Sequence, residues 1–128
     1  MENCVTTEVD ESRELALEAA RIADAQKGSN IVILQVGEVL GVTEYFVVVS
    51  ASNRRLVRTL VDEIEVQCRD AVSRTPSRTE GVREQQWVLL DYGDVVVHVF
   101  LEEIREFYDI ERLYKDVPVI PTGFEDAQ

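Results

Sequence analysis

The sequence predicts an α/β (α+β) domain in which a single mixed β-sheet of four to five strands is flanked by helices. Short apolar runs rich in β-branched residues alternate along the chain with segments whose apolar residues follow helical spacing. Strands that alternate with helices pack as one sheet covered by those helices. The 128 residues, 45% of them hydrophobic, suffice to bury one core without a disulfide or a metal.

The first helix is predicted at residues 9–27. Its apolar side chains recur at i, i+4, i+7 and i+8, which places them on one helix face: Leu15, Ala19, Ile22 and Ala23. Gly28 follows the periodic segment, and glycine readily takes the left-handed conformation that ends helices. We therefore expect Gly28 to end this helix.

Two buried strands are predicted at residues 30–36 and 44–50. Their sequences, NIVILQV and EYFVVVS, are short apolar runs with many β-branched residues, which is typical of central strands covered on both faces. Residues 38–42, which include Gly41, are expected to form a loop between them. The short connection indicates that the two strands are neighbours in one sheet.

A second helix is predicted from the capping residues Ser52 and Asn53 to about Arg74, because Ser and Asn side chains accept hydrogen bonds from free backbone amides. Its apolar stripe follows i+4 spacing: Leu56, Leu60, Ile64 and Cys68.

The first turns of this helix carry three cations, Arg54, Arg55 and Arg58. The helix dipole is positive at this end and disfavours cations there. Two explanations remain open: the arginines are simply solvated, or they contact a carboxylate or another anion.

A β-hairpin is predicted after a polar connecting segment, residues 75–84, that includes one short edge strand. Two apolar strands at residues 86–91 and 95–101 are separated only by the turn Tyr92-Gly93-Asp94, and such strands pair with each other. The hairpin and the segment after it carry most of the aromatic side chains of the chain.

The last helix is predicted at residues 103–114, and two prolines prevent a regular continuation beyond it. We expect the domain to span residues 9–121, between a flexible N-terminus of residues 1–8 and a flexible tail of residues 122–128.

The chain is strongly acidic, with 25 Asp and Glu against 13 Lys and Arg and a net charge of −12. The acid is concentrated at the two ends of the chain, whereas residues 54–84 carry seven basic and six acidic side chains. Phosphate backbones attract Lys and Arg, so we expect little or no direct nucleic-acid contact. Two explanations of the negative charge remain open: it provides solubility alone, or it attracts a basic protein partner.

Composition also excludes several environments. No apolar run approaches the roughly 20 residues that cross a bilayer, and the polar, acidic N-terminus is not a secretory signal. Cys4 and Cys68 lie far apart without CxxC spacing, as expected of reduced thiols. We therefore expect a cytoplasmic protein without a membrane contact.

Familiar catalytic and cofactor motifs are missing from the sequence. It has no P-loop, no GxGxxG and too few Cys and His for a zinc site, so no cofactor is expected. Ser50, His98 and Asp91 lack the nucleophile elbow of a serine hydrolase. Asp91 and Asp94 flank the hairpin turn, where carboxylates bind a divalent cation or, more often, hydrogen-bond the turn.

The hairpin supplies candidate binding residues. Strand alternation places Trp87, Leu89 and Asp91 on one face, and a face with both Trp and Asp is not a plain core face. Tryptophan is frequent at binding hot spots, so Trp87 is either a core residue or an interface residue. His98, in the apolar run VVVHVF, is either a buried, hydrogen-bonded histidine or a partner contact.

The residues from Trp87 to Tyr114 carry a specific pattern. Glu80-Gly81 and Trp87 precede the string LLDYGDVVVHVF, and Arg105, Tyr108, Glu111 and Leu113 come after it. In these positions the chain resembles the ribosomal silencing factor family, also called Iojap-like proteins. EYFVVVSASN is similar to the family's acidic residue, Tyr-Phe, apolar strand and Ser-rich turn. The resemblance covers residues 12–121.

Five positions depart from the family pattern. Gln35 and Glu44 stand where the family usually has Asp, Ala51 and Asn53 alter the Ser-Gly-x-Ser turn, and Tyr114 takes the place of a frequent Trp. The resemblance therefore implies no role for the exact positions 35 and 51, whereas the hairpin matches the family pattern.

The resemblance implies a nucleotidyltransferase-like fold without the transferase signature, because no Asp-x-Asp follows Ser50-Ala51-Ser52. It implies a non-enzymatic factor that binds ribosomal protein L-fourteen on the large ribosomal subunit. The bound factor blocks joining of the small subunit and represses translation under nutrient limitation. A homodimer is also implied. The alternative is a degenerate nucleotidyltransferase-like enzyme that uses Asp91 and Asp94 with a divalent metal.

The residues that we expect at the partner surface come from the hairpin and the helix after it. They are Trp87, Asp91, Tyr92, Asp94, His98, Glu102 and Tyr108.

Overall fold

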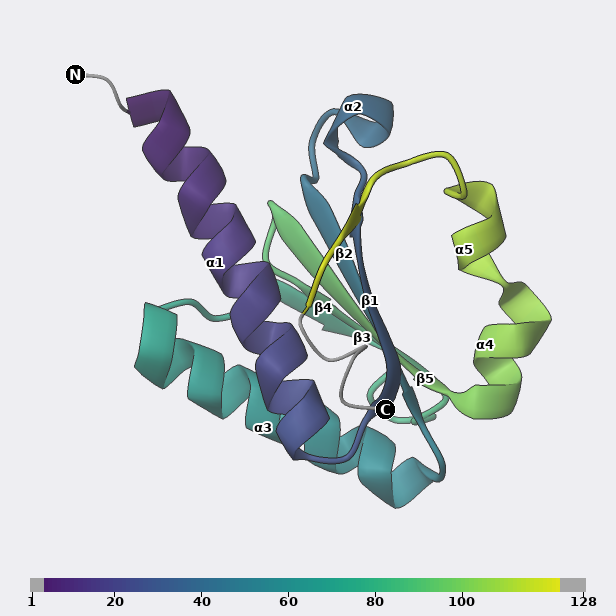
Figure 1. Ribbon diagram of the computed structural model, residues 1–128. Helices are drawn as coiled ribbons and strands as arrows, with labels where there is room; N and C mark the ends of the chain where they lie inside the picture. The colour runs from purple at the N-terminus through teal and green to yellow at the C-terminus, as the bar shows by residue number, and fades with distance from the viewer. Residues whose placement is uncertain (1–3, 123–128) are drawn as a thin grey trace.

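A six-stranded mixed sheet forms the centre of the protein in the computed structural model, which describes residues 4–122 and side chains from Glu11 onward (Figure 1). The elements in chain order are α1 (Cys4–Ala25), β1 (Ser29–Gln35), α2 (Gly37–Leu40), β2 (Tyr45–Ala51), α3 (Arg54–Val72), β3 (Arg78–Glu80), β4 (Trp87–Asp91), β5 (Val95–Leu101), α4 (Glu102–Tyr108), α5 (Ile110–Leu113) and β6 (Val119–Ile120). The predicted α/β class with one mixed sheet flanked by helices is confirmed, with one strand more than the upper expectation.

The strand order is β3-β4-β5-β2-β1-β6, and only the central pair, β2 with β5, is parallel. All seven residues of β2 are buried, as the continuous apolar run predicted for a strand covered on both faces. The predicted hairpin is confirmed, because β4 pairs antiparallel with β5 in a register that sets Trp87 opposite Phe100.

The two faces of the sheet are covered by different layers (Figure 1). The long helices α1 and α3 pack on one face and enclose the larger core. The short helices α4 and α5 lie over the opposite face and enclose a smaller core. Its buried members are Leu34, Val36, Phe46, Val48, Phe100 and Ile110.

The first helix differs from the prediction at both ends. It begins at Cys4, five residues before the predicted start, and ends at Ala25. Lys27, with φ 73°, takes the left-handed conformation that we expected of Gly28. Gly28 is instead needed for close packing, because a Cβ there would lie 2.6 Å from Cγ2 of Val49.

Three further elements depart from the sequence-based expectation. Residues 37–40 form a helical turn that ends at Gly41, with φ 82°, rather than a loop. The predicted helix 103–114 is broken at Asp109, whose left-handed φ of 48° redirects the chain into α5. The unpredicted strand β6 pairs with β1 at the sheet edge, where flanking prolines are tolerated.

Both predicted flexible segments lie partly beyond the described residues. Residues 1–3 and 123–128 fall outside them, and residues 4–8 are helical. Within residues 4–122, no helix has the length and apolar character that crossing a membrane requires.

Asp94 connects the hairpin turn to the helical layer. The Ser12 hydroxyl donates to Asp94 Oδ2 at 2.5 Å, and the Arg74 guanidinium donates to Asp94 Oδ1 at 2.6 Å and to the Tyr92 carbonyl at 3.2 Å. Burial opposes ionisation of Asp94, but the bonds from Arg74 and Ser12 outweigh it and hold the pKa of the carboxyl below its usual value. One carboxylate thus joins α1, the segment that follows α3 and the hairpin.

Replacing Arg74 by Met should therefore destabilise the fold, because it leaves the partly buried Asp94 carboxylate without its cation. We expect Arg74→Met to lower the free energy of unfolding by about 1–3 kcal/mol at neutral pH. Arg69→Met is the matched control, since Arg69 and Asp70 form an exposed pair worth little. Urea denaturation checks both variants, and equal effects would contradict the assignment.

The pH dependence supplies a second check of the same contact. A carboxyl with a lowered folded pKa stabilises the fold above its ordinary pKa and loses that contribution as the pH falls through the folded value. The difference between wild type and Arg74→Met should therefore shrink in acid.

Candidate functional site

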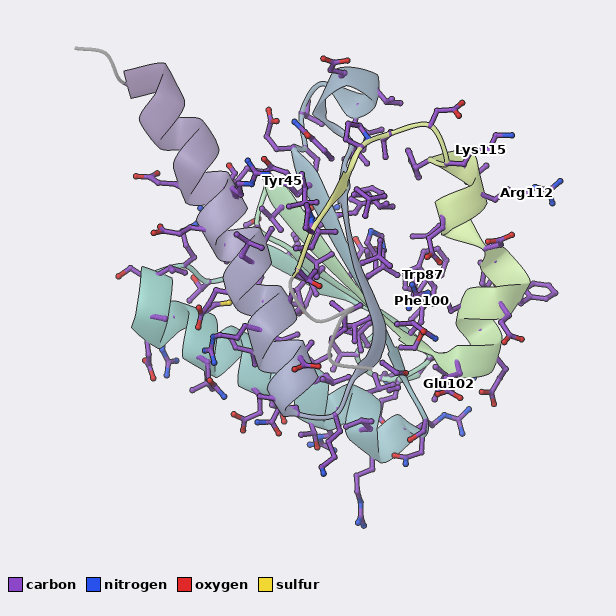
Figure 2. All side chains as sticks on the ribbon, in the orientation of Figure 1. Tyr45, Trp87, Phe100, Glu102, Arg112 and Lys115 are labelled. Atoms are coloured by element: carbon purple, nitrogen blue, oxygen red, sulfur yellow. The ribbon has the colours of Figure 1, made fainter. Side chains whose placement is uncertain are left out.

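Six rings gather on the sheet face under α4 and α5, and we call them the aromatic cluster. Alternation along β2, β4 and β5 directs four of them to this face, and α4 and the end of α5 add the other two. The members are Phe46, Trp87, His98, Phe100, Tyr108 and Tyr114. Figure 2 shows Trp87 and Phe100 between the sheet and the α4–α5 segment.

Trp87 lies at the centre of the cluster and is only half-buried. Its ring stacks on Phe100 with centroids 4.8 Å apart and contacts Tyr108 at 5.0 Å. Phe46 meets Tyr114 edge-on at 5.3 Å. Ring contacts of this kind stabilise a fold by more than the burial of their surface alone. The cluster therefore holds its outermost ring, Tyr108, in a fixed position.

His98 fixes the orientation of Trp87. The indole Nε1 donates to His98 Nδ1 at 3.1 Å, so Nδ1 is the acceptor and the neutral ring carries its proton on Nε2. His98 is buried, and burial lowers its pKa from 6.5 to about 3. The expectation of a buried, hydrogen-bonded histidine is thus confirmed. Its Nε2 has no hydrogen-bond partner among the described residues.

The outer surface of α4 and α5 exposes apolar side chains among carboxylates. Phe107 is 78% exposed, Leu113 77% and Tyr108 51%. Exposed carboxylates surround them on α4 and at its C-cap, namely Glu102, Glu103, Glu106 and Asp109, whereas the exposed charge on α5 is the cation Arg112. We call Phe107, Tyr108, Leu113 and these carboxylates the outer surface. Large exposed apolar side chains within a polar rim are typical of protein-binding sites.

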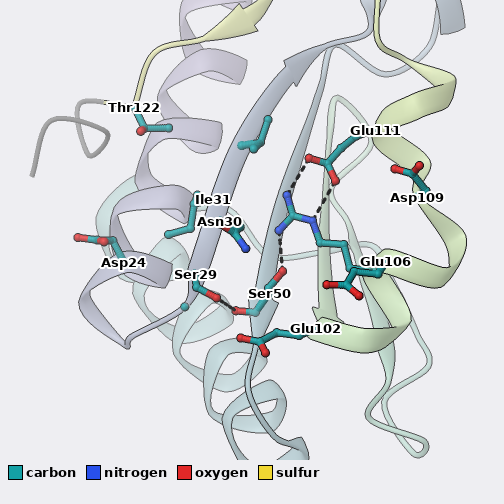
Figure 3. A pocket seen from close by; sticks show the side chains of 13 residues that line it. Asp24, Ser29, Asn30, Ile31, Ser50, Glu102, Glu106, Asp109, Glu111 and Thr122 are labelled. Atoms are coloured by element: carbon teal, nitrogen blue, oxygen red, sulfur yellow. Dashed lines mark hydrogen bonds and ion pairs between the residues drawn. The ribbon is translucent and has the colours of Figure 1, made fainter. Parts of the chain in front are cut away.

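A buried arginine attaches this surface to the sheet. Arg105 donates to Ser50 Oγ on β2 at 2.7 Å and forms a bidentate pair with Glu111 on α5 at 3.0 and 2.9 Å (Figure 3). The guanidinium therefore joins three elements, and the planar fork suits a carboxylate acceptor in this way. The left-handed residue Asp109 turns the chain so that Glu111 reaches back to Arg105.

Beside Arg105 lies an open cavity of about 890 Å³ (Figure 3). Five carboxylates line it against one arginine: Asp24, Glu102, Glu106, Asp109, Glu111 and Arg105. Glu111 neutralises Arg105, so the remaining lining is acidic and repels the phosphates of a nucleotide. Within the described side chains, no group of three or more His, Cys, Asp or Glu is placed to hold a metal ion.

The seven predicted contact residues separate into four groups. Glu102 and Tyr108 are exposed on α4, and Trp87 and His98 lie beneath Tyr108 within the aromatic cluster. Asp91 is half-buried on the same sheet face, where its Oδ1 accepts from the Gly93 amide at 2.8 Å and stabilises the turn.

Tyr92 and Asp94 lie toward the other layer. Tyr92 is 6% exposed and packs in the larger core, where burial raises the pKa of its hydroxyl. Asp94 is engaged by Ser12 and Arg74. Neither belongs to the outer surface, and the two carboxylates of the metal hypothesis, Asp91 and Asp94, have separate protein partners.

Sequence reasoning missed the exposed apolar side chains Phe107 and Leu113 and the buried anchor Arg105. Phe107 and Leu113 are typical of core residues of one helix, because the break at Asp109 gives no sequence signal. Arg105 and Glu111 are singled out only by the family pattern. The contact of Arg105 with Ser50 spans 55 positions and depends on the tertiary fold.

The fold and its outer surface define a small α/β protein that exposes aromatic and acidic side chains on helices packed against the sheet. Its sequence matches the family model described as "Ribosomal silencing factor during starvation" over residues 9–128. The chain therefore belongs to the ribosomal silencing factor family, as the sequence pattern implied.

Several relatives have curated names. The ribosomal silencing factors RsfS of Bacillus subtilis and Chromobacterium violaceum are 33% and 34% identical over 83% and 84% of this chain, and 89% and 84% of their own lengths. The chloroplastic protein Iojap of Arabidopsis thaliana is 33% identical over 94% of this chain, which spans about half (51%) of that relative. A mouse relative, 28% identical over 70% of this chain and 40% of its own length, is named mitochondrial assembly of ribosomal large subunit protein 1.

Two solved structures share the fold. A crystal structure of a Chromobacterium violaceum protein has a TM-score of 0.73 and 33% identity, and it covers 83% of this chain and 85% of its own. A crystal structure of a Bacillus halodurans protein has a TM-score of 0.74 and 28% identity, with coverage of 85% and 98%. The arrangement of sheet and helices is thus common to relatives of this chain.

The buried His98 makes a specific prediction about pH. Because its folded pKa lies below the unfolded value near 6.5, the unfolded state binds the proton first and stability falls as the pH drops. We expect a loss of about 1.4 kcal/mol per pH unit below 6.5.

Urea denaturation at several pH values between 7 and 5 checks this expectation. His98 is the only histidine of the chain, so His98→Gln should remove the slope in this range whatever its effect at pH 7. An unchanged slope in the variant would show that His98 is not the group responsible.

Proposed function

We propose that this protein binds the large ribosomal subunit through ribosomal protein L-fourteen and blocks joining of the small subunit. It would thereby repress translation under nutrient limitation, acting in the cytoplasm and without catalysis. The observation that carries this proposal is the outer surface of α4 and α5, where exposed rings stand among carboxylates. The curated names of its bacterial relatives support a ribosomal role.

Charge and shape suit this partner. A ribosomal protein that binds RNA is basic, so the carboxylates of the outer surface would attract it and set its orientation. Phe107 and Tyr108 would then supply affinity by burying their rings. The two rings already contact each other edge-on, with centroids 5.0 Å apart, and a contact made before binding reduces the ordering that binding requires.

In this proposal, some of the predicted contact residues touch the partner and others support them from within the fold. Glu102 and Tyr108 touch the partner, whereas Trp87 and His98 position Tyr108 from below. Asp91 stabilises the hairpin turn at the rim of the same face. A homodimer that used the outer surface would compete with the ribosome, because a two-fold interface occupies the same patch on both copies.

Truncation of an exposed ring should weaken binding sharply. We expect Tyr108→Ala to raise the dissociation constant for large subunits about 30-fold, which corresponds to about 2 kcal/mol for a hot spot. Val66→Ala is a control that removes a partly exposed apolar side chain from α3. Co-sedimentation with separated subunits measures both, and failure of the wild type to pellet with large subunits would overturn the proposal.

The inhibitory step needs its own experiment. Large subunits incubated with the protein should join small subunits less than untreated ones, because the bound factor occupies the joining surface. Light scattering or sucrose-gradient profiles measure the joined ribosomes, with Tyr108→Ala as the variant that should restore joining. If the protein binds large subunits but joining is not reduced, the steric mechanism is refuted, whereas the proposed binding partner is not.

A further inference from the structure

Four arginines form a basic patch on this acidic protein, and the proposed function does not use them. Arg54, Arg55 and Arg58 lie in the first turns of α3, and Arg83 lies in the segment between β3 and β4. All four are exposed. Arg58 and Arg83 line one groove of about 360 Å³ between these two elements, together with Asp62 and several valines. We call these four residues the arginine patch.

The arginines of the patch have no ion pair among the described side chains, unlike five other arginines. Arg21, Arg69, Arg74, Arg78 and Arg105 lie within 4.0 Å of a carboxylate oxygen. Among the side chains from residue 11 to 122, no carboxylate forms such a pair with a member of the patch. The described carboxylates therefore leave this cluster without an ion pair, as they also leave Arg13 and Arg112.

The location of three of these cations is unfavourable for the isolated protein. The first turn of α3 holds no acidic residue, whereas the first turn of α4 holds Glu102 and Glu103. The helix dipole favours the arrangement of α4 and opposes that of α3. Of the two explanations that the sequence left open, contact with an external anion accounts for both the clustering and the missing carboxylates.

The sheet brings the arginine patch close to the outer surface. β2 leads into α3 and β5 leads into α4, and these parallel strands pair with Ala51 opposite Leu101 at their carboxyl ends. The two helices therefore begin at the same end of the sheet and run along opposite faces (Figure 1). At this end of the sheet, the arginines of α3 lie on one face and the carboxylates of α4 lie on the other.

We propose that the arginine patch binds the phosphate backbone of ribosomal RNA beside the protein contact of the outer surface. This inference rests on the proposed function, because a large subunit presents basic proteins next to RNA. Guanidinium groups bind phosphates with good geometry, and exposed arginines suit a backbone contact without base recognition. This inference would revise, at the arginine patch, the expectation of little or no direct nucleic-acid contact.

The salt dependence of binding tests the inference. Arg54→Gln/Arg58→Gln/Arg83→Gln should weaken binding to large subunits roughly 10-fold or more at low salt. It should also flatten the plot of log affinity against log salt by about 2 to 3, since each phosphate contact contributes roughly 0.7 to 0.9. Arg13→Gln/Lys27→Gln/Arg69→Gln removes the same charge from elsewhere and should keep the slope. Equal behaviour of the two variants would overturn the inference.

Directed cleavage identifies what the patch touches. Iron–EDTA is tethered to Arg55→Cys in a Cys4→Ser background, where the remaining thiol, Cys68, is buried. A tether on Arg69→Cys, near the other end of α3, is the control. Cleavage of ribosomal RNA from position 55 and not from position 69 would support the inference. Absence of cleavage from position 55 would overturn it in favour of an acidic protein or a second copy of this chain.

The outcomes separate the two proposals. If the wild type does not pellet with large subunits, the proposed function fails and this inference fails with it. If the wild type pellets and responds to Tyr108→Ala but not to loss of the arginine patch, only the inference fails.

Discussion

The parallel pairing of β2 with β5 is the constraint on which the rest of the structure depends. A strand buried on both faces needs a cover on each side, and β2 is buried along its whole length. The long helices α1 and α3 supply one cover, and the short α4–α5 segment supplies the other. The same pairing makes both strands end together, so α3 and α4 begin at one edge of the molecule.

The two covers are built by different physical means. The larger core is mainly aliphatic, and α1 and α3 pack against each other as well as against the sheet. The smaller core relies on stacked rings and on the buried Arg105, which holds β2, α4 and α5 through directional hydrogen bonds. Directional contacts and ring stacking fix the position of a short helix more sharply than aliphatic packing does. The outer surface gains its preorganisation from this difference.

Sequence patterns were sufficient where a property is local. Helical spacing identified α1 and α3, Asn53 was recognised as the cap of α3, and the short turn predicted the β4–β5 hairpin. They failed where a distant contact decides the conformation. Asp109 lies within a helical pattern, yet its left-handed backbone brings Glu111 back to Arg105, which is anchored on Ser50, 55 positions away.

The ends of the sheet have a consequence for solubility at high concentration. An open strand edge is a template for pairing with another chain, which leads to aggregation. Here one edge is β6, two residues flanked by Pro118 and Pro121, and the other is β3, three exposed residues that include Arg78 and Glu80. Short, charged or proline-flanked edges resist strand addition. The architecture thus blocks the simplest route by which copies of this chain would polymerise edge to edge.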